Sequence, residues 1–169
     1  RKNIFFADKA VSEIACHAKG ARWLVPTART VIDIGGQDCK ALRLDKNGEV
    51  AKFTANDKCA SGTGRFLEVM ARLLQVSMEE LGTMSVRAAA PVTMASTCTV
   101  WAQSDVIRYI NSGCSLSDIG AGINAAMAKR AAILANSVGV ANDIIMTGGV
   151  AKNQGVVKEL EKLLGARIK

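Results

Sequence analysis

Apolar positions along four short segments of the chain follow the spacing of β-strands. β-branched and other apolar residues mark 30–34 (TVIDI), 39–45 (CKALRLD) and 49–55 (EVAKFTA), and the turn signal KNG lies at 46–48. This pattern predicts one strand followed by a β-hairpin. A further strand is predicted within 143–150 (DIIMTGGV), where an apolar run leads into a glycine turn.

Helical spacing of apolar residues marks most of the remaining chain. It predicts a helix within 8–20 that ends at Gly20, and further helices at 64–76, 99–113, 115–139 and 154–165. The longest of these begins after a serine of the kind that caps helices. Because strands and helices alternate towards the end of the chain, the predicted class is α/β.

Composition and charge exclude several classes of protein. The 169 residues carry a formal net charge of +7, but Lys and Arg are scattered and aromatic residues are only 4%. The sequence therefore predicts no nucleic-acid partner, and the basic surface suits an acidic protein partner better. No apolar run reaches the ~20 residues that span a bilayer, and no signal peptide opens the sequence, so we expect a cytoplasmic protein with no membrane segment. Because the chain starts at Arg1 and stops on a strand-like ARIK, we expect a fragment.

The first glycine turn, in VIDIGGQD, has the residues of a phosphate and Mg²⁺ site. Asp33 lies near the end of the predicted strand, and Gly35 and Gly36 allow backbone amides to approach an anion. Mg²⁺ keeps most of its waters and takes one or two carboxylates. Gln37 and Asp38 are placed to orient an attacking water. An ordinary tight hairpin with Gly-Gly at its bend explains this stretch equally well.

The second glycine turn, in MTGGVAKNQG, has Gly148 and Gly149 between a strand and a helix. Such a turn can pass close under the adenosine or phosphates of a nucleotide. A plain connection from strand to helix is the commoner alternative. The pattern GxGxxG is absent, because Leu67 stands at the third glycine position after Gly62 and Gly64, and a Walker A motif is absent as well.

The five cysteines have long, irregular gaps, which argues against a disulfide framework and against a zinc site of local pairs. The default for each is a small buried side chain. Cys59 and Cys98 differ because each stands just before a predicted helix, the second after the potential caps Ser96 and Thr97. A helix N-terminus lowers the pKa of a thiol and favours a thiolate bound to metal. An iron–sulfur cluster needs four ligands, so two thiols per chain are enough only if a two-fold dimer brings together two from each subunit.

The segments DIGGQD, NDKCASGTGRFLEVMARLL, STCTVWAQSDV and TGGVAKN occur in this order. In order and spacing they resemble the ATP-dependent activators of 2-hydroxyacyl-CoA dehydratases and the related ATPase subunits of benzoyl-CoA reductase. The resemblance implies an actin-like, sugar-kinase-like (ribonuclease H-like) ATPase fold, of which this chain holds mainly the second lobe. It also implies a homodimer that binds one 4Fe-4S cluster through Cys59 and Cys98 of each subunit.

The resemblance further implies ATP hydrolysis that drives a low-potential electron into a dehydratase, with ferredoxin or flavodoxin as electron source. On this view residues 1–28 are a helical lead-in and 29–169 form the nucleotide- and cluster-binding lobe. Asp33 and Gln37 are then the expected catalytic residues. The expected cofactor-binding residues are Gly35, Gly36, Gln37, Asp38, Ser61, Gly62, Gly64, Gly148, Gly149, Val150 and Asn153. Ser61 to Gly64 would connect nucleotide and cluster.

The chain departs from the family pattern in places. A first glycine-rich phosphate loop, which family members have before the region of Arg1, is missing, and Gln103 and Asp105 stand where glutamates are usual. Cys39 receives no role, Cys16 and Cys114 are expected to be packing residues, and the single His17 is expected on a helix surface or in the core. Alternatives to the activator are a benzoyl-CoA reductase ATPase subunit, a plain kinase of the same fold, or a non-catalytic module.

Overall fold

A four-stranded mixed sheet is the base of the fold. The computed structural model describes residues 6, 8–56, 59–95 and 98–169. In the strand order β3-β2-β1-β4, β1 (Thr30–Ile34) pairs antiparallel with β2 (Cys39–Leu44), and β2 pairs antiparallel with β3 (Val50–Asn56). On its other side β1 pairs parallel with β4 (Ile144–Thr147). The chain end extends the sheet beyond β4, because Ile168 bridges Ile144.

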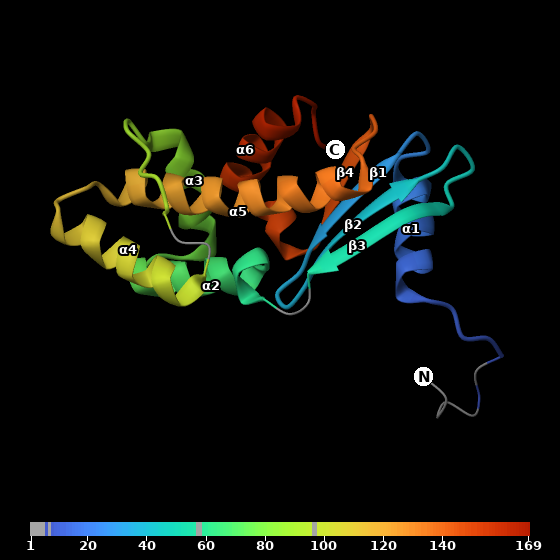
Figure 1. The fold of residues 1–169 in the computed structure, drawn as a ribbon, viewed down its shortest axis with the longest axis horizontal. Helices are drawn as coiled ribbons and strands as arrows, with labels where there is room; N and C mark the ends of the chain where they lie inside the picture. The colour runs from blue at the N-terminus through green and yellow to red at the C-terminus, as the bar shows by residue number, and fades with distance from the viewer. Residues whose placement is uncertain (1–5, 7, 57–58, 96–97) are drawn as a thin grey trace.

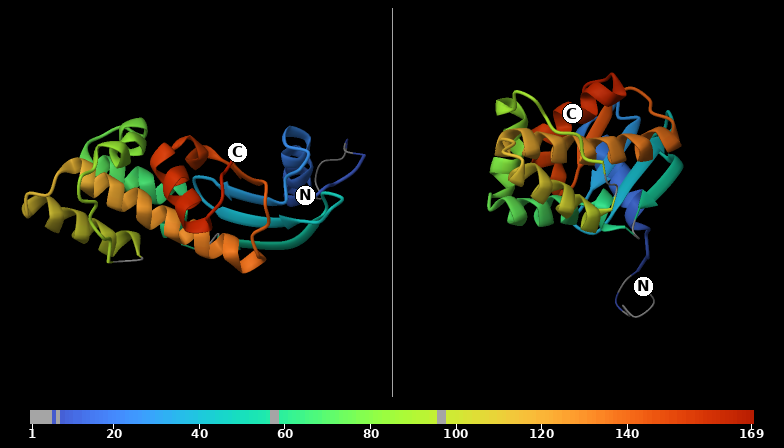
Figure 2. Two further views of the ribbon diagram at one scale, coloured as in Figure 1. Left: turned by 90° about the horizontal axis from the view of Figure 1, so that it is seen from above. Right: turned by 60° about the vertical axis from the view of Figure 1, so that its left-hand side comes forward.

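The helices lie unequally on the two faces of this sheet (Figure 1). One face carries α1 (Glu13–Leu24), and α5 (Leu116–Val138) runs along the other. The remaining elements are α2 (Gly64–Leu74), α3 (Met78–Arg87), α4 (Thr99–Asn111), α6 (Gln154–Leu164), and the short 3₁₀ turns η1 (Ala60–Gly62) and η2 (Gly149–Lys152). In the view from above, α2 to α4 extend beyond the sheet around one end of α5 (Figure 2).

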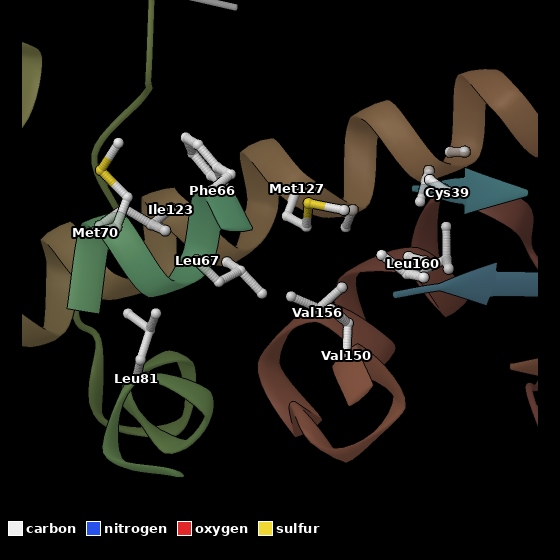
Figure 3. Packing of buried hydrophobic residues seen from close by; sticks show 14 of the residues in the cluster. Cys39, Phe66, Leu67, Met70, Leu81, Ile123, Met127, Val150, Val156 and Leu160 are labelled. Atoms are coloured by element: carbon white, nitrogen blue, oxygen red, sulfur yellow. The ribbon is translucent and has the colours of Figure 1, made fainter. Parts of the chain in front are cut away.

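Two apolar clusters follow from the alternation of side chains along β1. Val31 points towards α1 and joins a small cluster with Ala18 and Ala21, whereas Ile32 and Ile34 join the large cluster on the α5 side. Both faces of β1 are therefore buried. The large cluster brings Phe66, Leu67, Met127, Val156 and Leu160 together from α2, α5 and α6 (Figure 3).

Most predicted elements are present, with two differences. α1 does not end at Gly20: it begins after Ser12, whose side chain accepts a hydrogen bond from the Ala15 amide, and it continues to Leu24. Burial of Ala21 against the sheet outweighs the low helix propensity of one glycine. α3 was not predicted, although Ser77 and Glu80 form a reciprocal capping box at its start. Among the described residues, no helix is long and apolar enough to cross a membrane.

Candidate functional site

Three polar side chains meet at the carboxyl ends of β1 and β4. Asp33 on β1 lies opposite Lys40 on β2 and Thr147 on β4 in the strand register. Since side chains alternate along a strand, all three project towards the α1 face. Asp33 is buried, with 8% of its surface exposed, and its Oδ1 accepts a hydrogen bond of 3.0 Å from the Thr147 hydroxyl. The strand register therefore places the carboxylate of Asp33 at the carboxyl ends of β1 and β4.

Helix α1 brings His17 to the same place. His17 Nε2 lies 2.8 Å from Thr147 Oγ1, and Nδ1 lies 3.7 Å from Asp33 Oδ2. Because the threonine hydroxyl donates to Asp33, it is free to accept a hydrogen bond from His17 Nε2. Sequence reasoning assigned His17 no role. No local signal in the sequence indicates this contact, because it depends on the packing of α1 against the face of β1 that carries Val31 and Asp33.

Lys40 is a second residue that sequence reasoning missed. Its Nζ lies 2.6 Å from Asp38 Oδ2, 3.0 Å from Glu13 Oε1 and 3.7 Å from Asp33 Oδ2. Burial alone would lower the pKa of Lys40, but hydrogen bonds to Asp38 and Glu13 outweigh it and raise the pKa. Lys40 is therefore a fixed positive charge among three carboxylates, and Asp38 is engaged with it.

The Gly35–Asp38 turn projects beyond this cluster. The Gly35 amide donates to the Asp38 carbonyl at 2.9 Å, which closes the turn. Gly36 and Gln37 are exposed at its tip, and a Cβ added to Gly36 would meet no atom within 4 Å. The tip therefore has room for a ligand, with the Gln37 side chain beside it.

The back of this turn is hydrogen-bonded to the start of α2. The Gly64 amide donates to the Gly35 carbonyl at 2.7 Å, and the Arg65 amide donates to the Gly36 carbonyl at 3.1 Å. The approach is close: a Cβ at Gly64 would lie 3.0 Å from the Gly35 oxygen. Ser61, Gly62 and Gly64 are all buried. These residues thus lie behind the turn and join it to the segment that contains Cys59.

The second glycine turn passes directly beside the first. Gly148 has a φ of +83°, and a Cβ there would lie 2.3 Å from the Ile34 carbonyl oxygen and 2.9 Å from Asp33 Oδ1. Only glycine fits this backbone and this approach. Val150 is buried in the large cluster, where its side chain lies near Val156 (Figure 3). Gly149 is exposed.

Beyond Gly149 lies a cavity of about 440 Å³ between α3, η2 and α6. The residues that line it are Met78, Glu79, Gly82, Thr83, Gly149, Lys152, Asn153 and Gln154. Asn153 caps α6 by accepting from the Val156 amide, and its Nδ2 donates to Asn124 Oδ1 at 3.0 Å. The fully buried Asn124 donates in turn to the Leu81 carbonyl at 2.8 Å and to Ser85 at 3.0 Å. This network fixes the walls of the cavity.

The two predicted metal ligands lie at the starts of helical segments. Cys59 is the N-cap of η1 and Cys98 is the N-cap of α4, and both are exposed. The capping expected of Ser96 and Thr97 falls outside the described residues. Hydrogen bonds from the Ser61 side chain and amide lower the pKa of Cys59, and the charge of Arg130 adds to the effect. Among the described residues, no three His, Cys, Asp or Glu side chains form a metal-binding group.

The other cysteines divide between core and surface. Cys39 is buried, and burial, with the charges of Asp33 and Asp38, raises the pKa of its thiol to about 12. Cys114 is half-buried and packs against the large cluster, as expected. The packing prediction for Cys16 is wrong, because this residue is exposed on α1, away from Ala18 and Ala21, which face the sheet.

The parallel pair of β1 and β4 ends in two adjoining glycine turns, and a cavity between helices lies next to them. The chain belongs to the BadF/BadG/BcrA/BcrD ATPase family, whose sequence model matches residues 1–169. The activator resemblance and the actin-like α/β ATPase fold predicted from the sequence are thereby confirmed. A solved activator of the 2-hydroxyisocaproyl-CoA dehydratase from Clostridium difficile, with ADPNP bound, superposes with a TM-score of 0.93 at 46% identity, over 99% of this chain and 63% of that one.

Other relatives carry related names. The activator of lactoyl-CoA dehydratase from Anaerotignum propionicum is 52% identical over 97% of this chain and 63% of its own length. A benzoyl-CoA reductase subunit from Thauera aromatica is 41% identical over 86% of this chain and 52% of its own length. An ethanolamine utilization protein, EutJ from Carboxydothermus hydrogenoformans, shares the fold alone, with a TM-score of 0.50 at 16% identity over 90% of this chain and 47% of that one. The chain therefore spans less than two thirds of the activators that it resembles.

Proposed function

We propose that the intact protein is an ATP-hydrolysing activator that passes single electrons to a 2-hydroxyacyl-CoA dehydratase. The observation that carries this proposal is the pair of hydrogen bonds from Gly64 and Arg65 to the carbonyls of Gly35 and Gly36. They connect the proposed phosphate turn with the segment that bears Cys59. Relatives of 46–52% identity are named as activators of 2-hydroxyacyl-CoA dehydratases, which supports a dehydratase of this class as the partner.

Asp33 and the Gly35–Asp38 turn are proposed to hold Mg²⁺ and the phosphates. Mg²⁺ binds through one or two carboxylates and retains water ligands, and Asp33 is a carboxylate fixed by Thr147 beside an open turn. Gln37 is exposed at the tip of the turn, where it would orient the water that attacks the terminal phosphate. Lys40 keeps a positive charge next to these groups.

The adenosine is proposed to enter the cavity beside Gly149 and Asn153. A volume of about 440 Å³ is in the range of small-ligand sites, and Gly149 and the capped Asn153 form one wall. Helix α3 supplies the opposite wall through Gly82 and Thr83. This arrangement supports the adenosine role expected for Gly148 to Asn153, with Val150 acting as a packing residue beneath the turn.

Cys59 and Cys98 of two subunits are proposed to hold a 4Fe-4S cluster. The donor set fits: thiolates are the ligands of such clusters, both thiols are exposed, and two from each subunit of a homodimer make four. When bound, the cluster accepts and releases one electron. Val100 and Trp101 beside Cys98 are 66% and 67% exposed, which suits a surface that a second subunit covers.

The electron acceptor is proposed to be the dehydratase, and the electron source a ferredoxin or flavodoxin in the cytoplasm. The net charge of +7 favours association with acidic proteins of this kind. A benzoyl-CoA reductase role is the second candidate. The identity of 41% to the reductase subunit from Thauera aromatica, against 46–52% to dehydratase activators, places it behind the first.

Anaerobic reconstitution of the intact protein with iron and sulfide tests the proposal. We expect about four irons per dimer, lost in Cys59→Ser and Cys98→Ser and retained in the matched variants Cys16→Ser and Cys114→Ser. ATP with Mg²⁺ should also change the rate at which bathophenanthroline removes the iron. A plain kinase or a non-catalytic module would bind no iron, and equal iron loss in all four variants would refute the ligand assignment.

A further inference from the structure

Arg130 on α5 contacts the segment 59–66, which begins with Cys59. Its Nη1 donates to the Ser61 carbonyl at 2.7 Å, across 69 positions of the sequence. Its guanidinium lies 4.4 Å from the centre of the Phe66 ring, a cation–π contact with a fully buried residue of α2. The side chain is half-buried and is therefore held between α5, η1 and α2.

The same guanidinium lies within electrostatic reach of both proposed ligands. A thiolate at Cys59 or at Cys98 would attract this guanidinium, although the two cysteines are 39 residues apart in the sequence. An arginine side chain stays protonated in proteins, so this positive charge is permanent. Its planar guanidinium can also donate a hydrogen bond to a carbonyl while it stacks on an aromatic ring.

We propose that Arg130 is a positioning residue that holds the Cys59 segment in place and sets the reduction potential of the cluster, an inference that rests on the proposed function. Reduction adds one electron to the cluster, with no bond broken and no proton taken up. A fixed cation beside the ligands stabilises the more negative, reduced form and so raises the potential. The hydrogen bond to Ser61 restrains the backbone two residues beyond Cys59.

Two variants separate the charge from the geometry. Arg130→Met keeps an unbranched apolar stem against Phe66 but removes the charge and the donor to Ser61. Arg130→Lys keeps the charge but loses the planar group that contacts carbonyl and ring together. Lys129→Met is the matched control, because it removes one positive charge from the neighbouring, exposed position of α5.

The experiment uses the intact protein reconstituted with iron and sulfide. Its midpoint potential is measured by dithionite titration with mediator dyes, and iron release to bathophenanthroline is followed separately. We expect Arg130→Met to lower the reduced-to-oxidised ratio at fixed potential by about tenfold, equivalent to a shift of about 59 mV for one electron. Arg130→Lys should restore most of that ratio. Both Arg130 variants should lose iron several-fold faster than Lys129→Met.

The outcomes distinguish this inference from the proposed function. A wild-type protein that takes up no iron overturns the proposed function, and this inference with it. An iron-loaded wild type with the same potential as Arg130→Met overturns the role of Arg130 alone. A purely structural role would make both Arg130 variants unstable without moving the potential of the clusters that remain, and that result also refutes the inference.

Discussion

Replacing Gly148 with alanine tests the close approach of the two glycine turns. The backbone there has φ +83° and ψ 174°, a region that is essentially restricted to glycine and that costs another L-residue about 1–3 kcal/mol. The added Cβ would also stand 2.3 Å from the Ile34 carbonyl oxygen, so β1 and β4 must separate locally. Overpacking of this kind costs about 1–3 kcal/mol. Together these effects should lower the free energy of unfolding by about 2–6 kcal/mol.

Gly149→Ala is the matched control for this change. A Cβ at Gly149 meets no atom within 4 Å, and the residue lies in the ordinary backbone of η2. We expect its effect on the free energy of unfolding to stay within about 0.5 kcal/mol, because an alanine also restricts the unfolded chain. The two variants therefore replace neighbouring residues, but the expected losses in the free energy of unfolding differ several-fold.

Urea unfolding of the intact protein, followed by circular dichroism, measures both changes. The midpoint for Gly148→Ala should fall while that for Gly149→Ala stays near wild type. Because the new methyl group would also lie 2.9 Å from Asp33 Oδ1, Mg²⁺-dependent ATP binding by Gly148→Ala should weaken even where the protein is fully folded. Equal losses for the two variants, or a loss below about 1 kcal/mol for Gly148→Ala, would refute the steric argument.

Other predictions concern the site and its surroundings. Gln37→Ala should slow ATP hydrolysis while nucleotide affinity, measured by calorimetry, is largely unchanged. Asn124→Leu should lower the free energy of unfolding by about 2–4 kcal/mol in urea titrations, since its buried partners lose their hydrogen bonds. The Cys39 thiol, with a pKa of about 12, should resist iodoacetamide at pH 9 until the protein is unfolded. Hydrogen bonds from Ser115 and from nearby amides lower the pKa of Asp118. The ionised carboxylate should therefore stabilise the fold fully at a pH above its unfolded pKa, and this stabilisation should be lost as the pH falls through the lower folded pKa. Acid titration of the wild type and of Asp118→Asn would detect the difference.

The strands, most of the helices and the glycine turns could be predicted because their signals are local. A run of β-branched residues locates β1, and the spacing of Phe66, Leu67, Met70 and Leu74 locates α2. The end of α1 was not predicted, because the burial of Ala21 that sustains the helix past Gly20 depends on a sheet formed later in the chain. Local signals also existed for α3 in Ser77 and Glu80, but a short helix with few apolar positions is easily missed.

The surroundings of Asp33 could not be predicted from the sequence. Asp33 and Gln37 stand out because a glycine turn follows a strand, whereas His17 and Lys40 reach the same carboxylate only through strand register and the docking of α1. Arg130 is separated from Ser61 by most of the helical part of the chain. Such contacts depend on how the elements pack against one another.

The turn at Gly35–Asp38 and the thiol of Cys59 share one rigid connection. The first two amides of α2 donate to carbonyls of the turn, so the turn cannot shift without moving α2 or breaking these two hydrogen bonds. Phe66, the third residue of α2, contacts the guanidinium of Arg130, which also donates a hydrogen bond to the carbonyl of Ser61, two residues after Cys59. Under the proposed function, a movement of the turn caused by bound phosphates would therefore reach the thiol both through the backbone and through α5. Nucleotide would drive such a movement only by binding one arrangement more tightly than the other, so the proposed coupling requires that ATP and ADP differ in their contacts at this turn.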